Sequence, residues 1–146
     1  MSTSKLPIVA ALAALALGAC TGPAEPKLAA LDGTQGDTLN WNTAEEEPAL
    51  EDTTLIGEVD DLRVFAARNA DGEWCAAITL PETTEREPFA SLSCVDSDRF
   101  LTHGVILEMS DPSREVGATV LPDNFSGELD SKWERVNDNL AVHYER

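Results

Sequence analysis

The chain is poor in the residue types on which most catalytic and nucleic-acid-binding sites depend. It holds two histidines, three cysteines and ten lysines or arginines, against 27 aspartates and glutamates. A phosphate backbone is bound by clusters of lysine and arginine, and the sequence has none, which excludes nucleic acid as a partner. It also lacks a zinc-protease helix motif, a nucleophile elbow and a glycine-rich phosphate loop. These absences favour a protein that binds over an enzyme.

The sequence also lacks an apolar run long enough to span a membrane. Residues 6–17 form an apolar stretch that the polar sequence TGPAEPK follows after Cys20, whereas a transmembrane helix needs about 20 apolar residues. A lysine, Lys5, precedes this stretch, and small residues follow it. This is the layout of a secretory signal, so we predict that residues 1–19 are a signal peptide removed from the mature protein.

The end of this signal reads Leu17-Gly18-Ala19-Cys20, which resembles the lipobox of bacterial lipoproteins. The resemblance implies that the Cys20 thiol carries a diacylglyceryl group, that the signal is cut before it, and that the new N-terminus is often acylated, for example with palmitate. Two or three acyl chains anchor stably where one chain is marginal. The expected location is the extracytoplasmic face of the cell membrane. The alternative is an ordinary signal peptide with Cys20 in the mature fold.

Residues 20–52, after the lipidated cysteine, have the composition of an acidic flexible linker. Between residues 21 and 52 there are eight acids, one base, three prolines and three glycines, a composition that does not offset the entropy of ordering the chain. Trp41 does not fit this composition, and it either docks on the domain or anchors a partner. The mature chain carries 9 bases and 27 acids, a charge of −18, which promotes solubility or attracts a basic partner.

Residues 53–146 are long enough for one small β-rich globular domain. A domain of this size is marginal and benefits from a cross-link. With Cys20 committed to lipid, Cys75 and Cys94 remain as an even pair in an oxidising compartment, and we expect a disulfide between them. Two free thiols or half of a zinc site are the alternatives. A closed loop of about 20 residues stabilises a fold by roughly 3 kcal/mol in the chain-entropy treatment.

The residue pattern of this domain predicts strands. Residues 63–68 and 73–80 are apolar runs of strand length joined by Asn-Ala-Asp-Gly, which is typical of a hairpin. Alternation places Trp74 on the core face and Cys75 on the opposite face. A short helix is expected over residues 96–104, and further strands over 105–109, 115–121 and 139–144. The fold class is therefore mainly β, a small antiparallel sandwich or barrel-like domain with one short helix.

The order of these segments resembles that of small extracytoplasmic lipoproteins from high-GC Gram-positive bacteria. The resemblance covers residues 62–144 and rests on a hairpin ending in WCAAI, a short helix ending in FLTHGV, and the segments ATVLPDNF and ERVNDNLAV. It implies an envelope protein with a cysteine pair and without an established activity.

Few side chains are candidates for chemistry. His103 is expected at a helix end and His143 on the exposed face of the last strand, and neither has a catalytic motif around it. Carboxylate and amide oxygens cluster at 96–98, 123–124 and 137–139, but a calcium site needs six to eight oxygens in an ordered loop, and the twelve-residue calcium pattern is missing. We expect capping and turn roles for these residues, and no catalytic residue, metal or cofactor.

Three functions remain open. The first is a membrane-anchored, non-enzymatic module that binds a protein or an envelope component, through the Pro81–Pro88 loop or the sheet edge with His143 and Tyr144. The second is an acidic inhibitor of a basic cell-envelope enzyme, similar to lysozyme-inhibiting lipoproteins. The third is a hydrolase that uses a pair of carboxylates.

Overall fold

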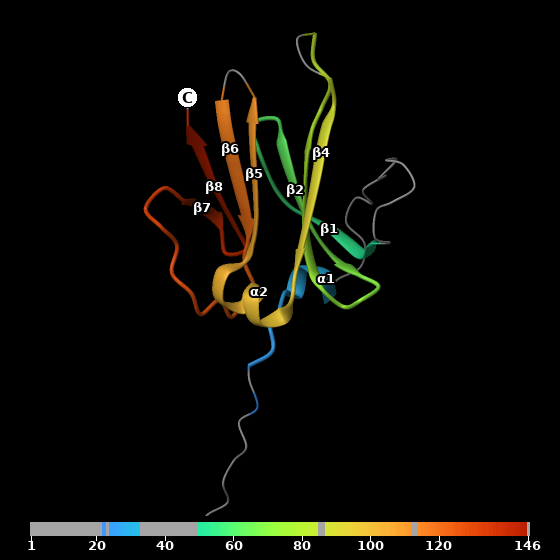
Figure 1. Ribbon diagram of the computed structural model, residues 1–146, viewed down its shortest axis with the longest axis vertical. Coiled ribbons are helices and arrows are strands. Elements are labelled where there is room, and N and C mark those ends of the chain that lie inside the picture. The colour runs from blue at the N-terminus through green and yellow to red at the C-terminus, as the bar shows by residue number, and fades with distance from the viewer. Residues whose placement is uncertain (1–21, 23, 33–49, 85–86, 112–113, 146) are drawn as a thin grey trace, which may run out of the picture.

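Two four-stranded antiparallel sheets form the domain. The computed structural model describes residues 22, 24–32, 50–84, 87–111 and 114–145. The sheet orders are β1-β2-β3-β4 and β5-β6-β8-β7, and the sheets face one another with α2 at one end (Figure 1). The elements are α1 Ala29–Asp32, β1 Leu50–Val59, β2 Leu62–Asn69, β3 Trp74–Leu80, β4 Phe89–Val95, α2 Ser97–His103, β5 Val105–Asp111, β6 Arg114–Val120, β7 Glu134–Asn137 and β8 Leu140–Glu145. The expectation of a mainly β antiparallel domain with a short helix is confirmed, and the four-residue helix α1 is an addition to it.

The hydrophobic core lies between the two sheets. Alternate residues of each strand point inward, as strand geometry requires. The first sheet contributes Val64, Ala66, Trp74, Ala76, Ile78 and Leu80, and the second contributes Val105, Leu107, Val116, Ala118, Val120, Leu140 and Val142. Cys75 is buried on the opposite face of β3, as the alternation of the sequence predicted.

The helix α2 begins and ends at the residues that the sequence indicates. The side chain of Asp96 accepts a hydrogen bond from the backbone N–H of Arg99 at 2.8 Å, which caps the first turn. Gly104 ends the helix at φ 72°, and its N–H donates to the Phe100 carbonyl. A Cβ atom at Gly104 would lie 2.6 Å from the Val120 carbonyl oxygen. Conformation and space therefore both require glycine here.

Residues 24–32 are an integral part of the domain. The Lys27 N–H donates to Asn124 Oδ1 at 2.9 Å, and the Asp123 N–H donates to the Lys27 carbonyl at 2.6 Å. Pro26 is buried, and Leu28 is only 2 % exposed and belongs to the hydrophobic core. The expected linker over 20–52 thus differs from the structure at 24–32, and also at 50–52, where β1 begins. Apolar burial and backbone hydrogen bonds together hold this segment, although the whole range 21–52 has the composition of a linker.

Several sequence predictions concern residues outside this description. The signal peptide, Cys20 and Trp41 all lie there. In the part of the chain that is described, no helix has the length and apolar character needed to cross a membrane.

Candidate functional site

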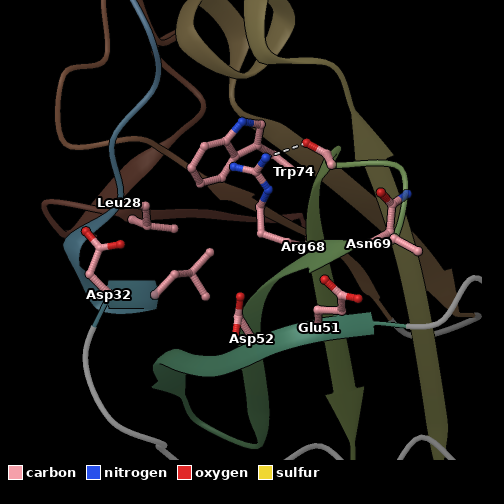
Figure 2. A pocket seen from close by; sticks show the side chains of 10 residues that line it. Leu28, Asp32, Glu51, Asp52, Arg68, Asn69 and Trp74 are labelled. Carbon is pink, nitrogen blue, oxygen red and sulfur yellow. Dashed lines mark hydrogen bonds between the residues drawn. The ribbon is translucent and has the colours of Figure 1, made fainter.

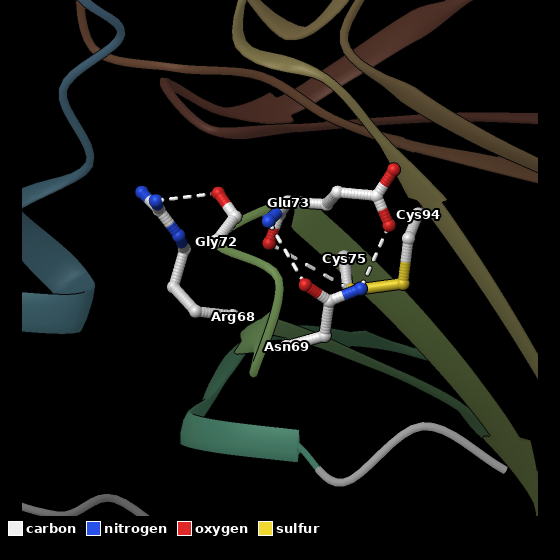
Figure 3. Close-up of a disulfide and its surroundings, with 6 residues drawn as sticks. All are labelled: Arg68, Asn69, Gly72, Glu73, Cys75 and Cys94. Atoms are coloured by element: carbon white, nitrogen blue, oxygen red, sulfur yellow. Dashed lines mark hydrogen bonds between the residues drawn. A yellow bond between two sulfur atoms is a disulfide. The ribbon is translucent and has the colours of Figure 1, made fainter.

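The disulfide joins neighbouring strands on the outer face of the first sheet. Cys75 on β3 and Cys94 on β4 are direct partners in the register, and their Cα atoms are 4.1 Å apart (Figure 3). The predicted pairing of these two cysteines is confirmed. Because six other residue pairs also join β3 to β4, the disulfide reinforces a register that the ladder already defines.

The turn between β2 and β3 is fixed next to this disulfide. The Asn69 side chain is 4 % exposed and makes two hydrogen bonds to Glu73, one from its amide to Glu73 Oε2 at 2.8 Å and one from the Glu73 N–H at 2.9 Å. The Arg68 guanidinium donates to the Gly72 carbonyl at 2.6 Å (Figure 3). The turn therefore holds the Arg68 side chain in a defined position.

The Arg68 guanidinium and the rings of Trp74 and Phe100 form a stack that joins the β2–β3 turn to α2. The guanidinium carbon lies 3.9 Å from the Trp74 ring centroid, a cation–π distance. The Trp74 ring in turn stacks on Phe100 of α2 at 4.6 Å, and its indole N–H donates to Ser97 Oγ at 3.2 Å. These contacts satisfy the polar edge of a tryptophan that is otherwise buried.

A pocket of about 310 Å³ opens beside this stack. Leu28, Leu31 and Trp74 give it apolar walls, and Arg68 lines it as well. Its acidic lining consists of Asp32 from α1 and of Glu51 and Asp52 from β1, all three exposed (Figure 2). We call these three residues the acidic rim.

The carboxylates of the acidic rim are available for a ligand. Within the described part of the chain none of them accepts a hydrogen bond or forms an ion pair, and Arg68 is directed to Gly72 and Trp74 instead. Asp52 has φ 49°, a left-handed conformation at a bulge of β1, which aspartate tolerates better than most residues. The three carboxylates outnumber the one guanidinium in the lining, and an excess of charge of one sign raises the local concentration of ions of the opposite sign. The arrangement is therefore suited to a cationic group.

His143 belongs to a second cluster, on the outer face of the second sheet. Its Nε2 lies 3.3 Å from Glu108 Oε1, and Trp133 packs against its ring edge-on at 4.7 Å. Its side chain is 3 % exposed, so the expectation of an exposed histidine was wrong. Gly117 beneath the ring makes room for it, since a Cβ at that position would lie 2.3 Å from Nε2. The imidazole is covered and is not open to a substrate.

Glu108 connects this cluster to Lys132. The Lys132 ammonium donates to Glu108 Oε1 at 2.8 Å, and this hydrogen bond, followed by that of His143, lowers the pKa of the Glu108 carboxyl. The same contact raises the pKa of Lys132. These bonds hold residues 132–133 over β5 and β8, which is a structural role.

The remaining candidates from the sequence have structural roles in the described residues. Asp96 caps α2, and His103 at the end of this helix pairs its Nδ1 with Thr102 Oγ1 at 2.8 Å. Asp123 and Asn124 bind residues 25–29, and Asn139 donates to Asp123 Oδ1 at 2.8 Å. No group of three or more His, Cys, Asp or Glu side chains suited to a metal ion occurs among the described residues.

The sequence reasoning missed the acidic pocket because its walls come from the range interpreted as a linker. The signal was the pair Leu28 and Leu31, whose spacing of three residues is that of a helix face, within the predicted linker. The sequence favours the Pro81–Pro88 loop as the binding surface, and its described residues, 81–84 and 87–88, are exposed.

Comparisons with known proteins give no relative from which to infer a function. No protein-family model, curated protein or solved structure matches this chain.

Proposed function

We propose that this chain is an extracytoplasmic lipoprotein, anchored in the cell membrane through Cys20, whose domain binds a positively charged partner without catalysis. The sequence Leu17-Gly18-Ala19-Cys20 supports the anchor, and the Cys75–Cys94 disulfide is consistent with an oxidising compartment. The partner is a basic protein or a cationic component of the cell envelope.

The observation that carries the binding proposal is the pocket with the acidic rim. Three carboxylates from α1 and β1, which have no partner among the described residues, line a hollow with apolar walls. An apolar wall holds the methylene groups of a lysine or arginine side chain, while the carboxylates bind its charged end. Electrostatic complementarity of this kind sets specificity and the association rate more than it sets affinity.

The test uses the lipidated full-length protein in mild detergent. We would titrate a labelled oligolysine peptide and follow its anisotropy at 0.1 M and 1 M salt, where the Debye length is about 10 Å and about 3 Å. We expect binding at low salt that weakens at high salt. Replacing the acidic rim by Asp32→Asn, Glu51→Gln and Asp52→Asn should weaken it strongly.

A matched control removes three other exposed carboxylates, through Glu82→Gln, Glu87→Gln and Glu128→Gln. This control loses the same charge and should bind nearly as well as the wild type. Equal losses in both triple variants would show that only net charge matters and would contradict a site at the pocket. If the protein also inhibited a basic cell-envelope enzyme added to it, the inhibitor function would replace simple binding.

A further inference from the structure

The N-terminal segment enters the domain at the end that carries α2. Asn124 donates to the Glu25 carbonyl at 2.9 Å, and Ser126, in the same loop, donates its N–H to the carbonyl of Leu101 in α2 at 3.0 Å. Figure 1 shows the blue N-terminal segment at this end, next to α2, while β3 and β4 are connected at the opposite end. The point of entry is thus at one pole of the sandwich.

The segment is held firmly at this pole. Besides the bonds of Lys27, the Ala29 N–H donates to Asp123 Oδ2 at 2.8 Å. Asp123 also accepts from Asn139, so the attachment continues into β8 through its neighbour Leu140. Leu28 anchors the segment in the core between the sheets. The domain therefore does not swivel freely about residue 25.

The free length between Cys20 and this attachment is short. Ala24 is the first residue of the continuously described segment and follows Cys20 by four positions. Four residues span at most about 14 Å when fully extended. A chain of this length is comparable to the width of one sheet layer, so it restricts both the distance and the orientation of the domain.

We infer that the domain stands on the membrane with its α2 end facing the lipid surface and the Pro81–Pro88 loop pointing away from it. This inference rests on the proposed lipid anchor at Cys20. Because Leu28 and Asp32 line the pocket, the acidic rim lies in the membrane-proximal half. The cationic partner is accordingly one that sits at the membrane surface, such as a basic segment next to a membrane anchor.

The orientation comes from the short covalent link and not from adhesion to lipid. The α2 end exposes the carboxylates of Asp98 and Asp123, and also that of Glu128, which follows Gly127 at the backbone of Thr102 in α2. Anionic headgroups repel these charges. The domain therefore stays as far from the bilayer as the link between Cys20 and Ala24 allows, with a layer of water between the domain and the lipid. This layer leaves room for a basic segment to reach the pocket.

The experiment measures the height of two labels above a membrane. Lipidated protein is reconstituted into phosphatidylcholine vesicles that contain an acceptor dye on the headgroup. A donor dye is placed on a new cysteine, either by Glu128→Cys at the α2 end or by Glu82→Cys at the opposite pole. The native cysteines are occupied by lipid and by the disulfide. Seven-residue strands such as β3 separate the two labels by roughly 23 Å.

We expect several-fold higher energy transfer from position 128 than from position 82. A 20-residue Gly-Ser insertion directly after Cys20 should remove most of this difference while both proteins still float with the vesicles. Equal transfer from the two positions without the insertion, or higher transfer from position 82, would overturn the orientation. Protein that does not float and whose mass lacks the diacylglyceryl group would overturn the anchor itself, which is a separate and recognisable failure.

Discussion

At the scale of single residues, space for a side chain decides where polar groups go. His143 is buried on the outer face of the second sheet because its neighbour across the ladder is Gly117 and because Trp133 covers the ring. A larger residue at position 117 would occupy the space of the ring, which is why the strand pattern alone predicts an exposed histidine. Its Nδ1 is buried and has no hydrogen-bond partner among the described residues, an arrangement that costs free energy.

Replacing Gly117 with alanine tests this arrangement. The new Cβ would lie 2.3 Å from His143 Nε2 and 3.0 Å from the Trp133 ring, so the imidazole must move. We expect the free energy of unfolding in urea to fall by about 1–3 kcal/mol, which is typical of overpacking. Gly22→Ala is the control, because no atom of the described residues lies within 4 Å of a Cβ placed there. A stable Gly117→Ala variant would show that the ring is not held there.

The Glu108–Lys132 pair gives a prediction about pH. The pKa of Glu108 in the folded protein is lowered from 4.5, chiefly by the hydrogen bond from Lys132. The contribution of Glu108 to the free energy of unfolding is therefore complete above pH 4.5, and it is lost as the pH falls through the folded pKa. The pKa of Lys132 is raised from 10.5. Its contribution to the free energy of unfolding is therefore complete below pH 10.5, and it is lost as the pH rises through the folded pKa. Glu108→Gln should therefore lower the melting temperature between pH 5 and 10, with the difference vanishing in acid. A pH-independent difference would contradict this electrostatic role.

At the scale of elements, the sequence predicts those parts that local signals define. The β2–β3 hairpin has a turn ending in Asp71-Gly72, and Gly72 does adopt φ 79°. The helix α2 has a cap and a glycine terminator. The segment 24–32 has no turn or cap signal, only the spacing of Leu28 and Leu31, and its position depends on contacts with Asp123 and Asn124, about 95 residues away. Composition alone therefore suggested a linker.

Substituting Leu28 measures how far this segment is part of the fold. Its side chain is 2 % exposed in the main core, and we expect Leu28→Ala to destabilise the protein by about 2–4 kcal/mol. Leu31→Ala should cost less, because Leu31 is half-buried and packs on the edge of the same cluster. The measurement is urea unfolding of both variants. Losses below about 0.5 kcal/mol for Leu28→Ala are typical of surface positions and would restore the linker interpretation.

At the scale of the whole molecule, charge and attachment act together. If residues 1–19 are removed as we propose, the chain carries a charge of −18. Anionic lipid and nucleic acid repel a chain of this charge, so the proposed covalent anchor is the route by which it would stay at a membrane. Three of the carboxylates that make up this charge, those of the acidic rim, lie together at the pocket. The repulsion of anionic partners and the proposed binding of a cation at the pocket thus follow from the same acidic composition.

The anchor is tested by Cys20→Ser. Without the thiol no diacylglyceryl group can be attached, so we expect the protein to leave the membrane fraction, or to persist as a heavier precursor that retains residues 1–19. The measurement is membrane fractionation in a bacterial host together with the intact mass of the protein. The double variant Cys75→Ser and Cys94→Ser is the control, since it removes the other two cysteines of the chain and should remain lipidated. If Cys20→Ser stayed in the membrane fraction at the mature mass, another anchor would hold the chain. The orientation of the domain would then no longer follow from the short link between Cys20 and residues 24–32.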